Sequence, residues 1–131
     1  MVEKDYIKRV IENIFKFVRK LLQMDFEENQ EAFIQESSDF LRDSFNVNIN
    51  SPTEDSLKNI FEIVTNQDEL KKINIILFRL SIAQSSIDLD KGKNLYKLFK
   101  KTFEKNNKTF FFTKDKLDLE IDELKIKNEK N

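Results

Sequence analysis

Glycine and proline each occur only once among the 131 residues of this chain. A fold built from β-strands needs many tight turns, and these two residues form a large share of such turns. Their scarcity therefore predicts few, long elements and an all-α protein. The length suits one domain with a core of its own. We expect residues 1–127 to form a single helical domain and residues 128–131 to be a frayed tail.

Hydrophobic periodicity predicts five or six helices. The first, residues 5–24, has an apolar seam with spacings of four and three (Ile7, Ile11, Ile14, Val18 and Leu21), flanked by Tyr6, Val10 and Phe17. The others are expected at residues 26–45, at 52–64, at 70–88, in a segment ending near 106, and around Leu117, Ile121 and Leu124. The last of these also alternates with period two, which leaves a strand open there, although its Lys, Glu and Leu content favours a helix.

Two positions predict helix boundaries. Ser51 and Glu54 have the spacing of a capping box, with Pro52 at the first helical position. Gly92 predicts the end of the fourth helix or the turn just after it. The surrounding segment DLDKGKN departs from a calcium loop, because its glycine comes one position early and no glutamate follows at the required place. We interpret it as a helix-ending turn.

Three segments together carry a resemblance to a known family: DYIKRVIE (5–12), DKGKNLYKLF (90–99) and KTFFF followed by IDEL (108–112 and 121–124). They resemble an uncharacterised family of small all-helical bacterial proteins whose helix pairs look like tetratricopeptide repeats. The resemblance implies stacked antiparallel helical hairpins, as a bundle or a short superhelix, and it assigns no activity to any residue. The chain departs from that pattern, since Phe, Leu or Ser often stands where helices of such repeats cross, and no repeat of about 34 residues emerges.

The chain contains no histidine and no cysteine. Ser-His-Asp catalysis, cysteine nucleophiles and histidine-based metal sites are therefore excluded, and a single glycine cannot build a phosphate-binding loop. Glu27 and Glu31 form a carboxylate pair, but they lie opposite the apolar stripe of their helix and are interpreted as solvated. We predict no catalytic, cofactor-binding or metal-binding residue, and we expect a non-enzymatic, cytoplasmic protein without a membrane segment.

Charge is distributed unevenly along the chain. Residues 22–69 hold twelve acids and two bases, net −10, whereas residues 91–116 hold nine lysines and two acids, net +7. Five lysines of the second segment are candidates for phosphate contact: Lys93, Lys97, Lys100, Lys101 and Lys108. Arginine is scarce and no exposed aromatic platform accompanies them. We therefore favour a solvated face that complements the acidic half of the same chain or of another copy.

The fourth helix has apolar residues on both faces. Either neighbouring helices cover both sides, which we favour, or Ile75, Phe78 and Ile82 reach the surface as an association patch. Both arrangements follow from the same pattern, so the sequence leaves them open.

Three consecutive phenylalanines, residues 110–112, precede the last expected helix. In an extended segment alternate side chains point in opposite directions. We expect Phe110 and Phe112 to pin the last helix to the bundle, and Phe111 to point outward as a candidate partner contact. The leading functional hypothesis is a protein–protein interaction or scaffolding module of unknown partner, self-association included. The alternative is nucleic-acid binding through the lysines.

Overall fold

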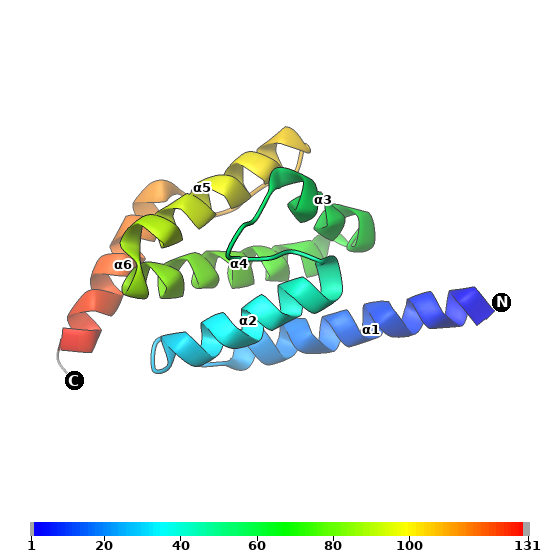
Figure 1. Ribbon diagram of the computed structural model, residues 1–131, viewed down its shortest axis with the longest axis horizontal. Helices are drawn as coiled ribbons and strands as arrows, with labels where there is room; N and C mark the ends of the chain where they lie inside the picture. Colours follow the sequence, from blue (N-terminus) through cyan, green and yellow to red (C-terminus); the bar gives the residue numbers. More distant parts are fainter. Residues whose placement is uncertain (1, 130–131) are drawn as a thin grey trace.

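The computed structural model describes residues 2–129, and within that range it is all-helical, with no strand. Its helices are α1 (Val2–Gln23), α2 (Gln30–Phe45), α3 (Glu54–Ile63), α4 (Gln67–Ile87), α5 (Leu89–Lys105) and α6 (Lys114–Glu129) (Figure 1). The predicted all-α fold is confirmed, and the sixth element is a helix. None of these helices combines the length and the apolar character that crossing a membrane requires.

The central helix is α4, which packs against α1, α2, α5 and α6 (Figure 1). Both of its faces are covered, because Ile73 and Leu77 on one side and Phe78 and Ile82 on the other are all buried. The expected stacking of sequential helices as antiparallel hairpins is not confirmed for every element. Instead, α3 packs mainly on α2 and α5, and α6 packs mainly on α4.

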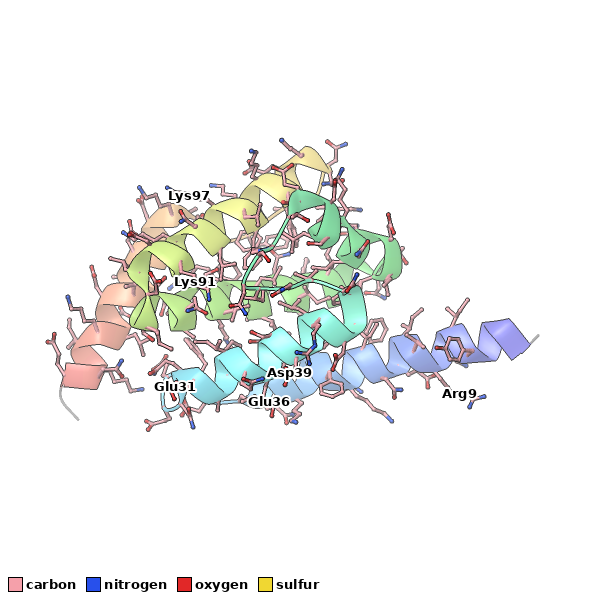
Figure 2. All side chains as sticks on the ribbon, viewed as in Figure 1. Arg9, Glu31, Glu36, Asp39, Lys91 and Lys97 are labelled. Atoms are coloured by element: carbon pink, nitrogen blue, oxygen red, sulfur yellow. The ribbon has the colours of Figure 1, made fainter. Side chains whose placement is uncertain are left out.

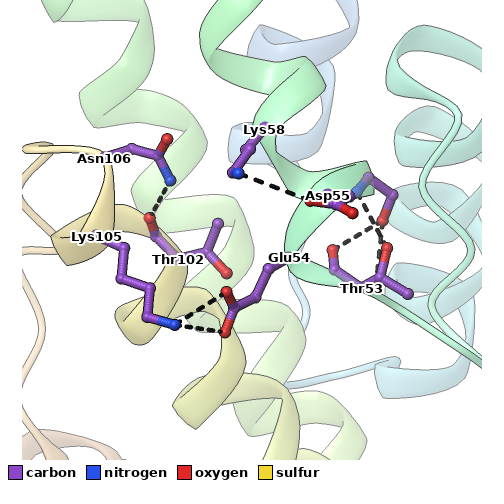
Figure 3. Close-up of polar contacts among 8 residues, drawn as sticks. Thr53, Glu54, Asp55, Lys58, Thr102, Lys105 and Asn106 are labelled. Atoms are coloured by element: carbon purple, nitrogen blue, oxygen red, sulfur yellow. Dashed lines mark hydrogen bonds and ion pairs between the residues drawn. The ribbon is translucent and has the colours of Figure 1, made fainter.

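The residue that caps α3 is Thr53 (Figure 3). Its hydroxyl accepts a hydrogen bond from the backbone N–H of Ser56 at 3.1 Å, and the Ser56 hydroxyl accepts one from the N–H of Thr53 at 3.3 Å. This is a capping box shifted by two residues from the predicted one, so the assignment of Ser51 as the cap is wrong. Pro52 precedes the cap, and the Glu54 carboxylate pairs with lysines of α5 instead of capping α3.

Gly92 lies in the first turn of α5, so the prediction that it ends α4 is wrong. A single residue, Asp88, separates the two helices: its N–H donates to the carbonyl of Gln84, and its carboxylate accepts from the N–H of Lys91. A Cβ added to Gly92 would lie 1.9 Å from Oγ and 2.4 Å from the backbone nitrogen of Ser85. Glycine is required here by the close approach of two helices.

The three-phenylalanine block holds the start of α6 on the bundle. Phe110 is buried edge-on against Tyr96, with ring centroids 5.8 Å apart. The ring of Phe112 stacks on Phe78 at 4.1 Å, and the Tyr96 hydroxyl donates to the carbonyl of Phe112 at 2.8 Å. Phe111 points outward. The predicted orientations of all three are confirmed.

The final helix continues to Glu129. Residues 128 and 129 of the expected tail thus belong to the last turn of α6, and its last two positions lie outside the described residues.

Candidate protein-interaction surface

The predicted association patch on α4 is not at the surface. Phe78 is covered by Phe112, and Ile82 is also buried, while Ile75 is half-buried. The side that these residues occupy is the one against which α6 packs. Of the four predicted partner contacts, only Phe111 is exposed, at 51%.

The predicted phosphate-contacting lysines are partly engaged by acids. The carboxylate of Glu54, at the start of α3, forms ion pairs with the ammonium groups of Lys101 at 3.2 Å and Lys105 at 3.3 Å. These pairs connect α3 to α5, and Figure 3 shows the one with Lys105. Hydrogen bonds from these two ammonium groups hold the pKa of Glu54 below its ordinary value. Lys93 lies 3.9 Å from Asp118 of α6. Part of the positive charge of α5 is therefore neutralised within the molecule.

The remaining predicted lysines do not form one surface. Lys97 and Lys100 line a shallow depression of about 600 Å³ together with Lys101, Lys105 and Lys114, and Glu104 shares it. Lys108 lines a separate and smaller depression at the start of α4. The structure thus divides the five candidates among three places.

The acidic side chains of α2 lie on the side of the molecule away from α5. Figure 2 labels Glu31, Glu36 and Asp39 on α2, and Lys97 on α5. Among the residues that the structure describes, no three acidic side chains are grouped closely enough to hold a metal ion. These three acids and Lys97 therefore lie on different sides of the molecule, whereas the acidic Glu54 pairs with lysines of α5.

A groove of about 690 Å³ lies where the end of α4, the start of α5 and α6 meet. Ile82, Ile121 and Leu124 contribute apolar surface, and its polar side chains carry charges of both signs. One oxygen of Asp118, Oδ1, is buried there and accepts no hydrogen bond from the described residues. The mixed charges of the groove favour no one class of ligand.

Among the side chains that the structure describes, α1 carries more large exposed apolar residues than any other helix. They are Tyr6 at 67%, Ile7 at 56%, Val10 at 37% and Phe17 at 45% exposed, and we call them the α1 stripe. Ile14, Val18 and Leu21 of the same helix are buried. Sequence reasoning assigned all of these to one inward half of the helix, so it missed the surface.

Tyr6, Ile7 and Val10 of the α1 stripe are exposed because α2 is too short to cover them, whereas Phe17 lies beside Phe40 of α2. The two helices are neighbours joined by a short loop, and α1 has 22 residues whereas α2 has 16. Asn46 ends α2 in the left-handed conformation, with φ of 57°, and asparagine is one of the few residues that adopt it readily. The first half of α1 consequently projects beyond the end of α2 (Figure 1).

Basic side chains border the α1 stripe. At about 100° per residue, Arg9, Lys16 and Lys20 fall within about 40° of one another, and their row lies about 80° from the centre of the row Tyr6, Val10 and Phe17. The Lys20 ammonium lies 5.7 Å from the centre of the Phe17 ring. Arg9 stands near the projecting end of α1 (Figure 2). The exposed surface is therefore apolar with a positively charged edge.

Comparison of the chain with protein-family models, with curated proteins and with solved structures gives no match. The resemblance to small bacterial proteins with tetratricopeptide-like helix pairs stays a prediction. A proposal for the function of the chain must therefore start from its own surface, and the α1 stripe is the surface feature from which we argue.

Proposed function

We propose that this chain is a non-enzymatic protein-interaction module and that the α1 stripe is its contact surface. The observation that carries the proposal is the exposure of four large apolar side chains on α1, the helix whose Ile14, Val18 and Leu21 are buried. Tyrosine and phenylalanine are enriched in protein interfaces. Covering such a side chain contributes about 1.5–3 kcal/mol when it becomes fully buried, so a partner along this stripe would be bound by the hydrophobic effect.

Nucleic-acid binding is the second candidate, and it rests on the depression lined by Lys97, Lys100 and Lys114. Its support is weaker. Glu104 lies in the same depression, and Lys101 is occupied by the carboxylate of Glu54 at 3.2 Å.

Photo-crosslinking tests the proposed contact surface. A p-benzoylphenylalanine placed at position 6 or 10 in cells of the native host is expected to give a defined adduct with another protein chain. The same group at position 19, which is exposed on the opposite side of α1, is the matched control and is expected to give none. Equal adducts from both sides, or none from positions 6 and 10, would refute the α1 stripe as a protein contact.

A further inference from the structure

The charge of α1 restricts what can cover its stripe. Residues 2–23 carry six basic and three acidic side chains, and residues 6–23 hold five of the six basic ones and one of the three acidic ones. An occupant that approaches the stripe must also face the basic edge formed by Arg9, Lys16 and Lys20. Complementary charge favours an acidic occupant, because like charges across an interface are costly.

The molecule already contains one such contact. The second half of α1 is covered by α2, which has four acids and one base and buries Phe33, Phe40 and Leu41. The rings of Phe17 and Phe40 stack at 6.2 Å, and Lys20 contacts Glu36 at 3.4 Å. The intramolecular partner of this basic, apolar helix is therefore an acidic amphipathic helix.

The uncovered half of α1 has the same character as the covered half. Tyr6 and Val10 lie in the same row as Phe17, at about 100° per residue, and therefore on the side along which α2 packs. Arg9 continues the row of Lys16 and Lys20. The contact with α2 stops only because α2 ends at Asn46.

We propose that an acidic amphipathic helix of another protein docks along the α1 stripe and continues the line of α2. This inference rests on the proposed function and names the chemistry of the partner. Its apolar face covers Tyr6, Ile7 and Val10, and its carboxylates face Arg9 and Lys16. Helix-in-groove recognition of this kind uses apolar residues at spacings of three and four.

Two other occupants fit the charges less well. A second copy that paired through its own α1 would bring two basic edges together. An anionic membrane surface would attract the basic edge, but Glu36 and Asp39 lie on α2 beside the Phe17 end of the stripe and would be repelled. Both are outcomes that the experiment separates.

The probe is a fluorescent synthetic peptide with the sequence of residues 29–46, kept helical by a hydrocarbon staple between positions 38 and 42 on its exposed side. A staple is needed because an isolated helix of this length is marginal in water. The control peptide keeps the apolar residues and the staple and carries Lys in place of Glu31, Glu36, Asp39 and Asp43. Fluorescence anisotropy against the full chain measures the dissociation constant.

We expect the acidic peptide to bind with a dissociation constant of about 1–100 μM at low salt, and the Lys peptide at least about tenfold more weakly. Tyr6→Ser combined with Val10→Ser, and separately Arg9→Glu, is expected to weaken binding at least about tenfold. Arg19→Glu makes the same charge change on the opposite side of α1 and is expected to alter binding less than about twofold. These side chains are exposed, so the variants are expected to keep the wild-type melting temperature.

Four results would overturn the inference. The first is no binding up to about 1 mM peptide, which corresponds to a binding free energy of about −4 kcal/mol, and the second is equal binding of the acidic and the Lys peptide. The third is dimerisation of the chain in light scattering that Val10→Ser abolishes. The fourth is flotation of the chain with phosphatidylcholine–phosphatidylserine vesicles that is lost when the α1 stripe is changed. Binding unaffected by the Tyr6/Val10 double change would also refute it, because the peptide would then be displacing α2. If the crosslink at position 10 forms while the acidic peptide fails, the interaction surface stands and only the acidic partner is wrong.

Discussion

Phe110 and Phe111 are neighbours in the sequence, yet Phe110 is 8% exposed and Phe111 51%. The segment between α5 and α6 is extended, so successive side chains point to opposite sides. Phe110 also contacts Phe103 edge-on at 5.3 Å. The extended backbone therefore directs the Phe110 ring into the core and the Phe111 ring toward solvent. The stability of the fold should depend more on Phe110 than on Phe111.

Phe110→Ala is expected to lower the free energy of unfolding by about 3–4 kcal/mol, as large deletions in a core do. Phe111→Ala, its matched control, is expected to change it by less than about 1 kcal/mol. Urea denaturation followed by circular dichroism measures both. Equal losses, or a larger loss for Phe111→Ala, would mean that the block does not hold α6 in the way described.

The alternation of these rings could be predicted from the sequence, but the role of Gly92 could not. A lone glycine near a helix boundary is typical of a helix end. Here its missing side chain makes room for Ser85, seven residues earlier in α4. Local sequence carries no sign of that approach, because it depends on the angle at which α4 and α5 meet.

At the scale of elements, the position of α3 depends on a polar contact with α5. Glu54 belongs to α3, and Lys101 and Lys105 belong to the last turns of α5 (Figure 3). Their hydrogen bonds lower the pKa of Glu54 from its ordinary value of 4.5. A carboxylate whose pKa is lower in the folded state stabilises the fold above its unfolded pKa, and this contribution is lost as the pH falls through the folded value.

Glu54→Gln is therefore expected to destabilise the chain at pH 7, by less than Phe110→Ala does, because the pair is exposed to solvent. As the pH falls through the lowered pKa of folded Glu54, the wild-type carboxylate becomes protonated and the two curves should converge. Asp55→Asn is the matched control, since it also removes an acid from the first turn of α3 but one that pairs with Lys58 inside the same helix. Urea denaturation at several pH values measures all three, and a difference between Glu54→Gln and the wild type that does not shrink as the pH falls would contradict the expectation.

The α1 stripe illustrates what periodicity can and cannot predict. The spacing in α1 correctly marks Ile14, Val18 and Leu21 as core, and it marks Tyr6, Val10 and Phe17 as apolar flank. Whether a flank is covered depends on the length of its neighbour. Because Asn46 lies more than thirty positions away from Val10 in the sequence, no local pattern in α1 reports where α2 ends.

At the scale of the whole molecule, the apolar residues on both faces of α4 predict that both faces are buried. The sequence does not predict which helices cover them. Pairing of sequential helices is the usual rule, but α3 packs on α5 as well as on its sequential neighbour α2, and α6 packs on α4. The start of α3 is held to α5 by Glu54, and α6 is held over α4 by the stacked rings of Phe78 and Phe112. Contacts between residues far apart in sequence decide such an arrangement.

The distribution of charge over the folded molecule predicts how the protein behaves toward nucleic acid. The chain has a net charge of −1, and a phosphate backbone that approaches α5 also meets Glu104 and the Glu54 carboxylate among its lysines. We expect micromolar protein to leave DNA and RNA unshifted in electrophoresis at about 150 mM salt, since phosphate binding weakens steeply as salt rises. At low salt, Glu54→Gln should bind more tightly than the wild type, because it releases Lys101 and Lys105, whereas Asp55→Asn should not. Salt-sensitive micromolar binding by the wild type that is lost when Lys97 and Lys100 become Glu would reverse the ranking and make the lysine face of α5 the functional surface.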